Sequence, residues 1–289
     1  TVAQEQLENF INTENIVALL VRSATTVRQD LIDACPSLKI IGRGGVGMDN
    51  IDVEYAREKG LSVINTPAAS SESVAELVFA HLFSGVRFLY DSNKTMALEG
   101  DSKFKNLKKA YAKGTELRGK TLGVIGFGRI GQATAKMALG LGMKVIAFDP
   151  FLEKITLSLS FHDGQTVDFE IKTVSKETVL KESDFITLHV PAQKDFVIGE
   201  AEFELMKDGS ALVNAARGGV VNEVALVAAL DSNKLAFAGL DTFENEPTPA
   251  VQILMNPKIS LTPHIGAATN QAQDRIGSEL ASQIISILK

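Results

Sequence analysis

A glycine-rich turn between a strand and a helix is the feature that most restricts how this chain can fold. The segment 126–131, Gly-Phe-Gly-Arg-Ile-Gly, follows a buried-type strand at 121–125 and opens a helix at 130–141, which leads into a second strand at 144–148. In such a unit the first glycine permits a tight turn, the second lets a pyrophosphate approach the backbone, and the third lets the helix pack closely. The context predicts a dinucleotide-binding domain.

The second strand ends in Asp149, about 20 residues beyond the turn, where such domains place an acidic residue for the adenosine ribose. A carboxylate accepts hydrogen bonds from both ribose hydroxyls and repels a 2′-phosphate, so the sequence favours NAD over NADP. Free N–H groups at the start of the helix add partial positive charge for the phosphates. We expect the cofactor to contact Gly126, Gly128, Arg129, Ile130, Gly131 and Asp149.

Short apolar or β-branched runs alternate with amphipathic stretches along most of the chain, a pattern typical of doubly wound parallel α/β domains. At 289 residues, about two domains are expected. Besides the two strands already named and a helix at 71–88, we predict strands at 16–21, 38–41, 61–65, 185–188, 211–214, 237–240 and 259–261.

Three stretches depart from this alternation. Residues 91–120 carry many lysines among few apolar residues, and they are predicted to be an arm or linker, either a solvated basic face or an arm that packs on a second subunit. Residues 151–182 show poor periodicity and predict no regular element. The chain opens on a helix-like stretch at 4–12, whereas an α/β domain usually begins with a strand, so we expect a first strand to be missing from this chain or its numbering.

Composition narrows the class of partner. With a net charge of −6, the chain lacks the positive potential that binding to a nucleic-acid backbone requires, so nucleic acid is not expected as a partner. No apolar run approaches the length of a membrane-spanning helix, so no membrane partner is expected. The only cysteine, Cys35, is interpreted as a small packing residue, which fits a reducing, cytoplasmic location. No metal site is predicted, and the expected ligands are NAD and a small molecule.

A second match to the glycine pattern occurs at 42–47, Gly-Arg-Gly-Gly-Val-Gly, after another predicted strand. The following strand ends in Asn65, so this unit lacks a carboxylate for a ribose. Backbone N–H groups of such a loop can form an anion nest, and Arg43 adds a charged fork suited to carboxylate or phosphate. We interpret the loop as a substrate-binding element, with a merely structural turn as the alternative.

A cation, an acid and an imidazole follow three predicted strands, at the edge of a parallel sheet where ligands collect. Arg217, Glu246 and His264 are the three residues. Oxidation of a 2-hydroxy acid by NAD requires a base near neutral pH, a carboxylate that orients it, and a fixed cation for the substrate carboxylate. His264 suits the first role, Glu246 the second and Arg217 the third. Taken singly, each could be a capping, packing or surface residue.

Five motifs in this order resemble the D-isomer-specific 2-hydroxyacid dehydrogenase family, and the likeness covers nearly the whole chain. They lie at 41–52, 119–131, 214–223, 240–247 and 261–269. The resemblance implies two doubly wound parallel-sheet domains: a Rossmann-type NAD domain at 89–265, inserted into a flavodoxin-like substrate domain at 1–88 and 266–289. It also implies a homodimer in which the NAD domain contributes an arm.

The resemblance assigns the same three catalytic residues and extends both binding sites. Further cofactor contacts are implied at Thr66, Val190, Pro191, Ala215, Ala216, Asp241 (at the nicotinamide amide), Gly266 and Ala267. Substrate contacts are implied at Arg22, Ser23, Arg43, Gly44, Gly45 and Val46.

The leading hypothesis for the reaction is NAD-dependent interconversion of 3-phospho-D-glycerate and 3-phosphohydroxypyruvate, the first step of serine biosynthesis. One alternative on the same scaffold is a hydroxypyruvate or glyoxylate reductase, or another D-2-hydroxyacid dehydrogenase. An alternative of a different class is an NAD-sensing, corepressor-like binding protein.

Overall fold

The computed structural model describes residues 2–289, which form two compact units. Of the described residues, the first unit comprises 2–73 and 267–289, and the second comprises Val74–Gly266. The chain passes from the first unit to the second within helix α4 (Ser71–Val86), earlier than the predicted boundary at residue 88. It returns between Gly266 and Ala267, one residue from the predicted position.

The first unit contains a parallel sheet in the order β1-β2-β3. Its elements are η1 (Gln4–Gln6), α1 (Leu7–Thr13), β1 (Ala18–Val21), α2 (Gln29–Ala34), β2 (Ile40–Arg43), α3 (Val53–Glu58), β3 (Ser62–Asn65) and α11 (Asn270–Leu288). Val21 pairs with Arg43, so the last residues of β1 and β2 lie side by side at the carboxyl edge of this sheet.

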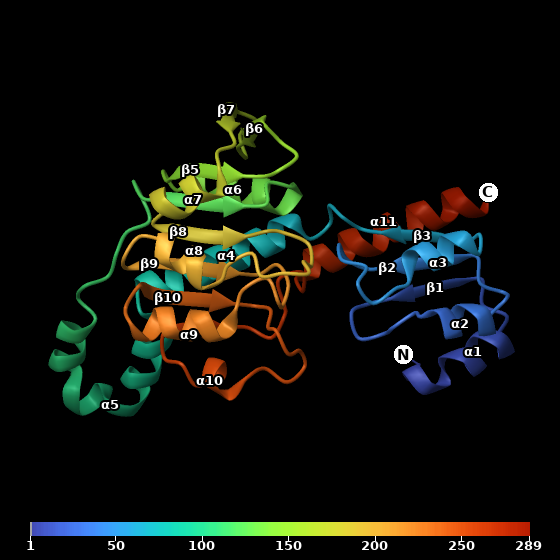
Figure 1. Ribbon diagram of the computed structural model, residues 1–289, viewed down its shortest axis with the longest axis horizontal. Helices are drawn as coiled ribbons and strands as arrows, with labels where there is room; N and C mark the ends of the chain where they lie inside the picture. Colours follow the sequence, from blue (N-terminus) through green and yellow to red (C-terminus); the bar gives the residue numbers. More distant parts are fainter. Residues whose placement is uncertain (1) are drawn as a thin grey trace. The chain divides into compact units, whose positions relative to one another are not determined.

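The second unit is built on a six-stranded, all-parallel sheet in the order β11-β10-β9-β8-β4-β5 (Figure 1). The strands are β4 (Thr121–Ile125), β5 (Lys144–Phe148), β8 (Phe185–Leu188), β9 (Ser210–Asn214), β10 (Leu235–Leu240) and β11 (Ile259–Leu261). Its helices, besides α4, are α5 (Leu89–Ala110), α6 (Arg129–Gly140), α7 (Lys176–Glu182), α8 (Glu200–Leu205), α9 (Glu223–Asp231) and α10 (Val251–Leu254). The strand order reverses at β4, which is the switch point where this fold binds ligands.

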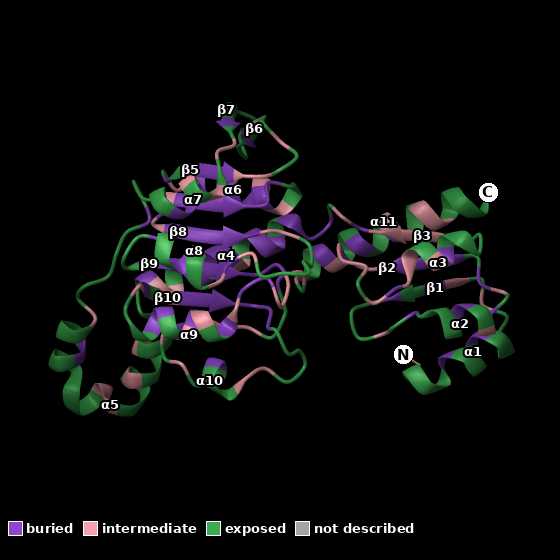
Figure 2. Cartoon of the chain, viewed as in Figure 1, coloured by how far each residue is buried: buried purple, intermediate pink, exposed green. Residues whose placement is uncertain are grey.

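Both faces of this sheet are covered, so its central strands are buried along their whole length (Figure 2). Along β9, Leu212 belongs to one hydrophobic cluster whereas Ala211 and Val213 belong to another, as expected when successive side chains point to opposite faces. Helices α7, α8 and α9 contribute to the first cluster, and α4 and α6 to the second. This is the Rossmann-type arrangement that the sequence predicts.

An antiparallel hairpin, β6 (Lys154–Ser160) and β7 (Thr166–Lys172), occupies part of the stretch for which no regular element was predicted (Figure 1). That prediction is wrong, although the alternation of apolar and polar residues and an Asp163-Gly164 turn were available as signals. Leu157 and Ile171 on the apolar face of the hairpin join the core of the second unit. The hairpin therefore belongs to this domain and is not a loose loop.

Helix α5 spans much of the segment at 91–120 that was predicted to be an arm or linker. It begins after Phe88, whose backbone is left-handed (φ 55°), and it is interrupted at Lys103. Leu107 is its one buried residue, whereas Leu98 and Phe104 expose 73% and 57% of their surface. In the part of the chain that the structure describes, no helix is both long enough and apolar enough to cross a bilayer.

The hairpin yields a test of domain integrity. Leu157→Ala should lower the free energy of unfolding by about 2–5 kcal/mol, because it removes a fully packed side chain from the core. Thr156→Ala, on the exposed face of the same strand, should lower it by less than about 1 kcal/mol. Urea unfolding followed by circular dichroism measures both. Equal effects of the two substitutions would show that the hairpin does not share the core.

Candidate functional site

The turn after β4 has the geometry that each of its glycines was predicted to provide. Gly126 has a positive φ of 88°, and a side chain there would meet the carbonyl of His189. Apart from Gly128 and its two chain neighbours, no atom of the described residues lies within 4 Å of the position that a Cβ would take at Gly128, so the backbone is open to a ligand there. A Cβ at Gly131 would lie 2.2 Å from the carbonyl oxygen of Gly126, so only glycine allows α6 to pack this closely.

The start of α6 and the end of β5 supply the polar groups. No side chain among the described residues caps α6, whose first N–H groups are thus left for a ligand. Asp149 accepts the N–H of Phe127 through Oδ2 (2.8 Å) and that of Phe151 through Oδ1 (2.9 Å). A carboxylate can accept roughly four hydrogen bonds, so Asp149 keeps capacity for two hydroxyls. These residues fit a dinucleotide.

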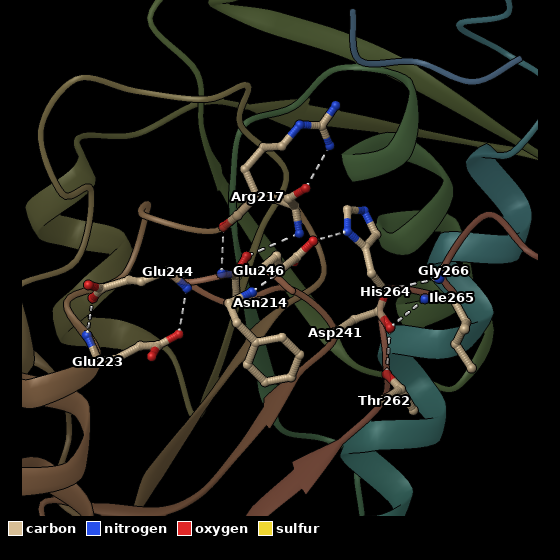
Figure 3. A network of polar contacts seen from close by, with 12 residues as sticks. Asn214, Arg217, Glu223, Asp241, Glu244, Glu246, Thr262, His264, Ile265 and Gly266 are labelled. Atoms are coloured by element: carbon tan, nitrogen blue, oxygen red, sulfur yellow. Dashed lines mark hydrogen bonds and ion pairs between the residues drawn. The ribbon is translucent and has the colours of Figure 1, made fainter. Parts of the chain in front are cut away.

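Arg217, Glu246 and His264 lie in loops that follow β9, β10 and β11, which are neighbouring strands (Figure 3). The strands are parallel, so these loops leave the same edge of the sheet as the glycine turn after β4. The second unit therefore gathers the three predicted catalytic residues at the edge that carries the nucleotide-binding turn.

The side chains of His264 and Glu246 contact each other directly. Nδ1 of His264 lies 2.8 Å from Oε2 of Glu246, and Oε1 of Glu246 accepts the N–H of Phe243 at 3.0 Å (Figure 3). With the carboxylate oxygen as acceptor, the Nδ1–H of His264 donates to Glu246, and Nε2 is directed away from Glu246. Both side chains are partly exposed, at 44% and 35%. The pair thus presents an oriented ring nitrogen to the edge of the sheet.

Asp241 holds the loop that carries His264. This residue is 1% exposed, and its Oδ1 accepts hydrogen bonds from the Thr262 hydroxyl (2.6 Å) and the Ile265 N–H (2.8 Å). Its Oδ2 accepts the Gly266 N–H at 2.8 Å. The resemblance places Asp241 at the nicotinamide amide, and this stays a prediction. The observed bonds give Asp241 a second task that the sequence did not indicate.

Arg217 is held through its backbone by Asn214, the last residue of β9. The Asn214 side chain accepts the N–H of Ala216 (3.0 Å) and donates to the carbonyl of Arg217 (2.9 Å). The Arg217 guanidinium donates to the Ala216 carbonyl at 2.7 Å and is half-buried. Asn214 was not predicted as a site residue, and its one signal is a polar side chain ending an apolar strand.

Two glutamates tie the Glu246 loop to the start of α9. The Glu223 N–H donates to Glu244 (2.6 Å), and the Glu244 N–H donates to Glu223 (2.8 Å), so each carboxylate caps the backbone of the other residue (Figure 3). Burial raises the pKa of Glu223; the N–H of Glu244 opposes this rise and the charge of Glu244 adds to it. Neither residue was predicted to act at the site.

The remaining predicted cofactor residues are divided between the units. Val190, Pro191, Ala215, Ala216 and Gly266 lie in the second unit, and Thr66 and Ala267 lie in the first. The hydroxyl of Thr66 is buried and finds no partner among the described residues. Next to Val190, burial lowers the pKa of His189 to about 3, so this ring is neutral at physiological pH.

The glycine loop of the first unit only partly matches its predicted use as an anion nest. The N–H of Gly44 donates to Val21 (2.9 Å) and that of Gly45 to Arg43 (2.9 Å), so these two amides are already used inside the protein. That part of the interpretation is wrong, because the loop pairs with β1 and folds back on itself. Val46 accepts the Asn65 amide through its carbonyl.

Arg43 and the turn that begins with Arg22 are linked by Asn50. The Asn50 amide donates to the carbonyls of Arg22 (3.0 Å) and Thr25 (2.5 Å) and accepts from Nε of Arg43 (3.4 Å). Arg43 also donates to the Gly44 carbonyl, while Arg22 and Ser23 are exposed. Asn50 thus brings together the two predicted substrate-binding segments at the carboxyl edge of β1 and β2.

Comparison with known proteins defines the family. The sequence model for the D-isomer specific 2-hydroxyacid dehydrogenase, NAD binding domain, matches residues 79–266. A hydroxypyruvate reductase of Thermotoga maritima is 46% identical over 275 residues, covering 93% of this chain and 84% of that protein. A D-3-phosphoglycerate dehydrogenase of Archaeoglobus fulgidus is 41% identical over 275 residues. The match covers 94% of this chain but only 49% of the length of that dehydrogenase.

A solved structure agrees with this comparison. A D-lactate dehydrogenase from Aquifex aeolicus, complexed with NAD and lactic acid, superposes with a TM-score of 0.77 at 31% identity, covering all of this chain and 86% of the other. The fold and the site define an NAD-dependent oxidoreductase with a Rossmann-type domain. The chain belongs to the D-isomer specific 2-hydroxyacid dehydrogenase family.

The raised pKa of Glu223 gives a pH-dependent prediction. The folded protein holds the Glu223 proton more tightly than the unfolded chain does, so this carboxyl lowers stability as pH rises above its ordinary pKa of 4.5. Glu223→Gln keeps an acceptor for the Glu244 N–H and removes the buried charge. Its melting temperature relative to wild type should therefore rise between pH 4 and pH 7.

Glu223→Ala is the matched control, because it removes the acceptor as well as the charge and should be less stable than wild type across this range. Differential scanning calorimetry at several pH values measures both variants. A Gln variant that melts as low as the Ala variant at pH 7 would contradict the role given to burial.

Proposed function

We propose that the protein interconverts 3-phospho-D-glycerate and 3-phosphohydroxypyruvate with NAD. The observation that carries the substrate assignment is the pair of arginines, Arg22 and Arg43, at the adjacent ends of β1 and β2. Arg217 suffices for the one carboxylate of a simple 2-hydroxy acid, whereas two further guanidinium groups suit a second anionic group such as phosphate. The first unit would then bind substrate and the second NAD.

The chemistry follows from the observed geometry of His264 and Glu246. In the oxidation direction, Nε2 of His264 takes the proton of the substrate hydroxyl while the hydrogen on carbon 2 leaves with its electron pair. The glycine turn at 126–131 and Asp149 would hold NAD, which would supply the acceptor for that hydride. Glu246 stabilises the imidazolium through Nδ1, and Arg217 binds the substrate carboxylate. In reduction, the protonated His264 returns the proton to the forming hydroxyl.

A hydroxypyruvate reductase is the second candidate, and the relative that favours it matches most of its own length, at 84%. Hydroxypyruvate lacks the phosphate but has the same carbonyl and carboxylate, so the same three catalytic residues would serve it. The two candidates differ in whether Arg22 contributes to binding. An NAD-sensing binding protein is the third candidate, and it would differ from both enzymes by binding NAD without turning over a substrate.

A panel of keto acids with NADH and NADPH in parallel tests these candidates. We expect NADH to be oxidised fastest with phosphohydroxypyruvate, and His264→Ala to lower kcat by about 10²–10⁴, because the proton donor is lost. Arg22→Met should raise KM for phosphohydroxypyruvate and leave that for hydroxypyruvate nearly unchanged. Arg28→Met is the matched control, since Arg28 pairs with Asp52 at 2.8 Å in the same unit.

Each other outcome of the panel points to one alternative. Equal kcat/KM for phosphohydroxypyruvate and hydroxypyruvate would overturn the phosphate assignment and favour the reductase. Tight NADH binding without turnover of any keto acid would favour the sensor. Equal use of NADPH would contradict the role given to Asp149.

We also propose that the protein is a homodimer assembled through α5. This helix exposes Leu89, Tyr90, Met96, Leu98 and Phe104 beside its lysines, which favours a packed arm over a purely solvated basic face. A helix with a single buried residue has little support within its own chain, and a partner surface would cover these side chains.

The dimer proposal is tested by the double substitution Leu98→Ser and Phe104→Ser. Each apolar side chain buried in an interface contributes about 1.5–3 kcal/mol, so the dissociation constant of the dimer should rise at least about a hundredfold. Analytical ultracentrifugation measures it. Val251→Ser, equally exposed at 73% but on α10, should leave the dimer intact. A monomeric wild-type protein would overturn the proposal.

A further inference from the structure

A buried histidine on α4 is not among the residues to which the proposed reaction has so far given a role. His81 is 2% exposed, and both nitrogens of its ring have partners in the last strand of the sheet and the loop after it. Nδ1 lies 2.8 Å from the hydroxyl of Ser260, and Nε2 lies 3.1 Å from the hydroxyl of Thr262. The ring fits because β10 has a glycine opposite it: a Cβ at Gly239 would lie 2.6 Å from the Cβ of His81.

The direction of each hydrogen bond follows from the carboxylate at the far end. Asp241 accepts the Thr262 hydroxyl at 2.6 Å, so the oxygen of that hydroxyl is left to accept the N–H at Nε2 of His81. Nδ1 is then the unprotonated nitrogen and accepts from Ser260. Burial lowers the pKa of His81, against the opposing charge of Asp241, which agrees with a neutral ring that has one N–H.

The hydrogen bonds therefore run in one direction from Ser260 through His81 and Thr262 to Asp241. The same carboxylate accepts the N–H groups of Ile265 and Gly266, the two residues that directly follow His264. This connects a side chain in the middle of a helix to the peptides beside the proposed acid–base residue.

The His264 loop needs such support because its backbone is strained. His264 has a φ of 53°, in the left-handed region that side chains other than glycine rarely adopt. Such a conformation persists only where the surroundings hold it. Glu246 holds the ring, and Asp241 holds the peptides that follow. If Thr262 turned its hydroxyl elsewhere, Asp241 would lose one of its three side-chain hydrogen bonds and be freer to move.

We propose that His81 is a positioning residue for the dehydrogenase reaction. It holds the Thr262 hydroxyl in the rotamer that donates to Asp241, and Asp241 in turn fixes the backbone that carries His264. His81 neither contacts substrate nor exchanges a proton during turnover. The inference rests on the proposed acid–base role of His264, but the hydrogen-bond direction on which it depends can be measured separately.

Two substitutions at position 81 separate the donor from the rest of the ring. The amide nitrogen of Gln can take the place of Nε2, whereas the shorter Asn reaches only the place of Nδ1. His81→Asn should lower kcat by about tenfold to a hundredfold, the effect of a small misplacement of a catalytic group, with KM for NADH changed less than twofold. His81→Gln should restore most of kcat. Equal losses in the two variants would overturn the inference.

A double-mutant cycle tests whether His81 acts through Thr262. Thr262→Val removes the hydroxyl and keeps the shape of the side chain, so it should lower kcat to a similar extent as His81→Asn. The double variant should be no slower than the slower single variant, because both substitutions break the same connection. Multiplying effects on kcat would mean independent action and would contradict the proposal.

Phe79→Leu controls for general destabilisation, because Phe79 is buried on the same helix and has no link to Asp241. It should lower the melting temperature without lowering kcat. If Phe79→Leu lowered both the melting temperature and kcat as much as His81→Asn does, the loss of kcat in His81→Asn would be explained by lower stability alone. That result would overturn the inference.

Long-range proton–nitrogen NMR of the four histidines decides the hydrogen-bond direction without any turnover. The signal lost in His81→Gln identifies His81, and it should be a neutral ring protonated on Nε2. A ring protonated on Nδ1, or charged at pH 7, would overturn the inference. If His264→Ala stayed active while the NMR result held, the acid–base proposal would fail instead, so the two failures are distinguishable.

Discussion

Parallel pairing of the six strands in the second unit determines where the polar side chains of the proposed site can gather. Each strand runs in the same direction, so every loop that follows a strand leaves from one edge. The glycine turn, Asp149, Arg217, Glu246 and His264 are far apart in sequence and share only this position after a strand. The buried apolar residues on both faces of the sheet fix its register, and the register fixes the edge.

Loops at this edge lack the hydrogen-bond partners that strands provide, and acidic or amide side chains supply them instead. Asn214 caps peptides on both sides of Arg217, Asp241 caps those after His264, and the Glu223–Glu244 pair caps the loop of Glu246. Each acceptor is itself tied to a strand end or a helix start. The proposed catalytic side chains thus inherit the rigidity of the sheet, which suits a reaction that depends on orientation.

Sequence patterns were sufficient where one local rule controls the structure. The bounds of β4 and β5, the backbone geometry at the three glycines and the contact between Glu246 and His264 follow from short-range spacing combined with the common sheet edge. The β6–β7 hairpin was missed because the periodicity over 151–182 as a whole is poor, which hides the short alternation within each of the two strands. The prediction that the backbone N–H groups of this loop are available to an anion was wrong for Gly44 and Gly45. Their N–H groups donate within the protein because the loop folds back toward β1, which the spacing of the glycines does not reveal.

The supporting residues could not be predicted because their function depends on partners that no spacing reveals. His81 lies in an apolar helix, where local packing is the ordinary interpretation, and its partners come from β11 and the loop after it.

The division of the chain into two units bears on the choice of substrate. The residues proposed for acid–base chemistry lie in one unit and the arginines proposed for phosphate lie in the other, so under this proposal chemistry and specificity could change independently. Overall identity, 46% to the reductase and 41% to the phosphoglycerate dehydrogenase, does not choose between two substrates that differ by one phosphate group.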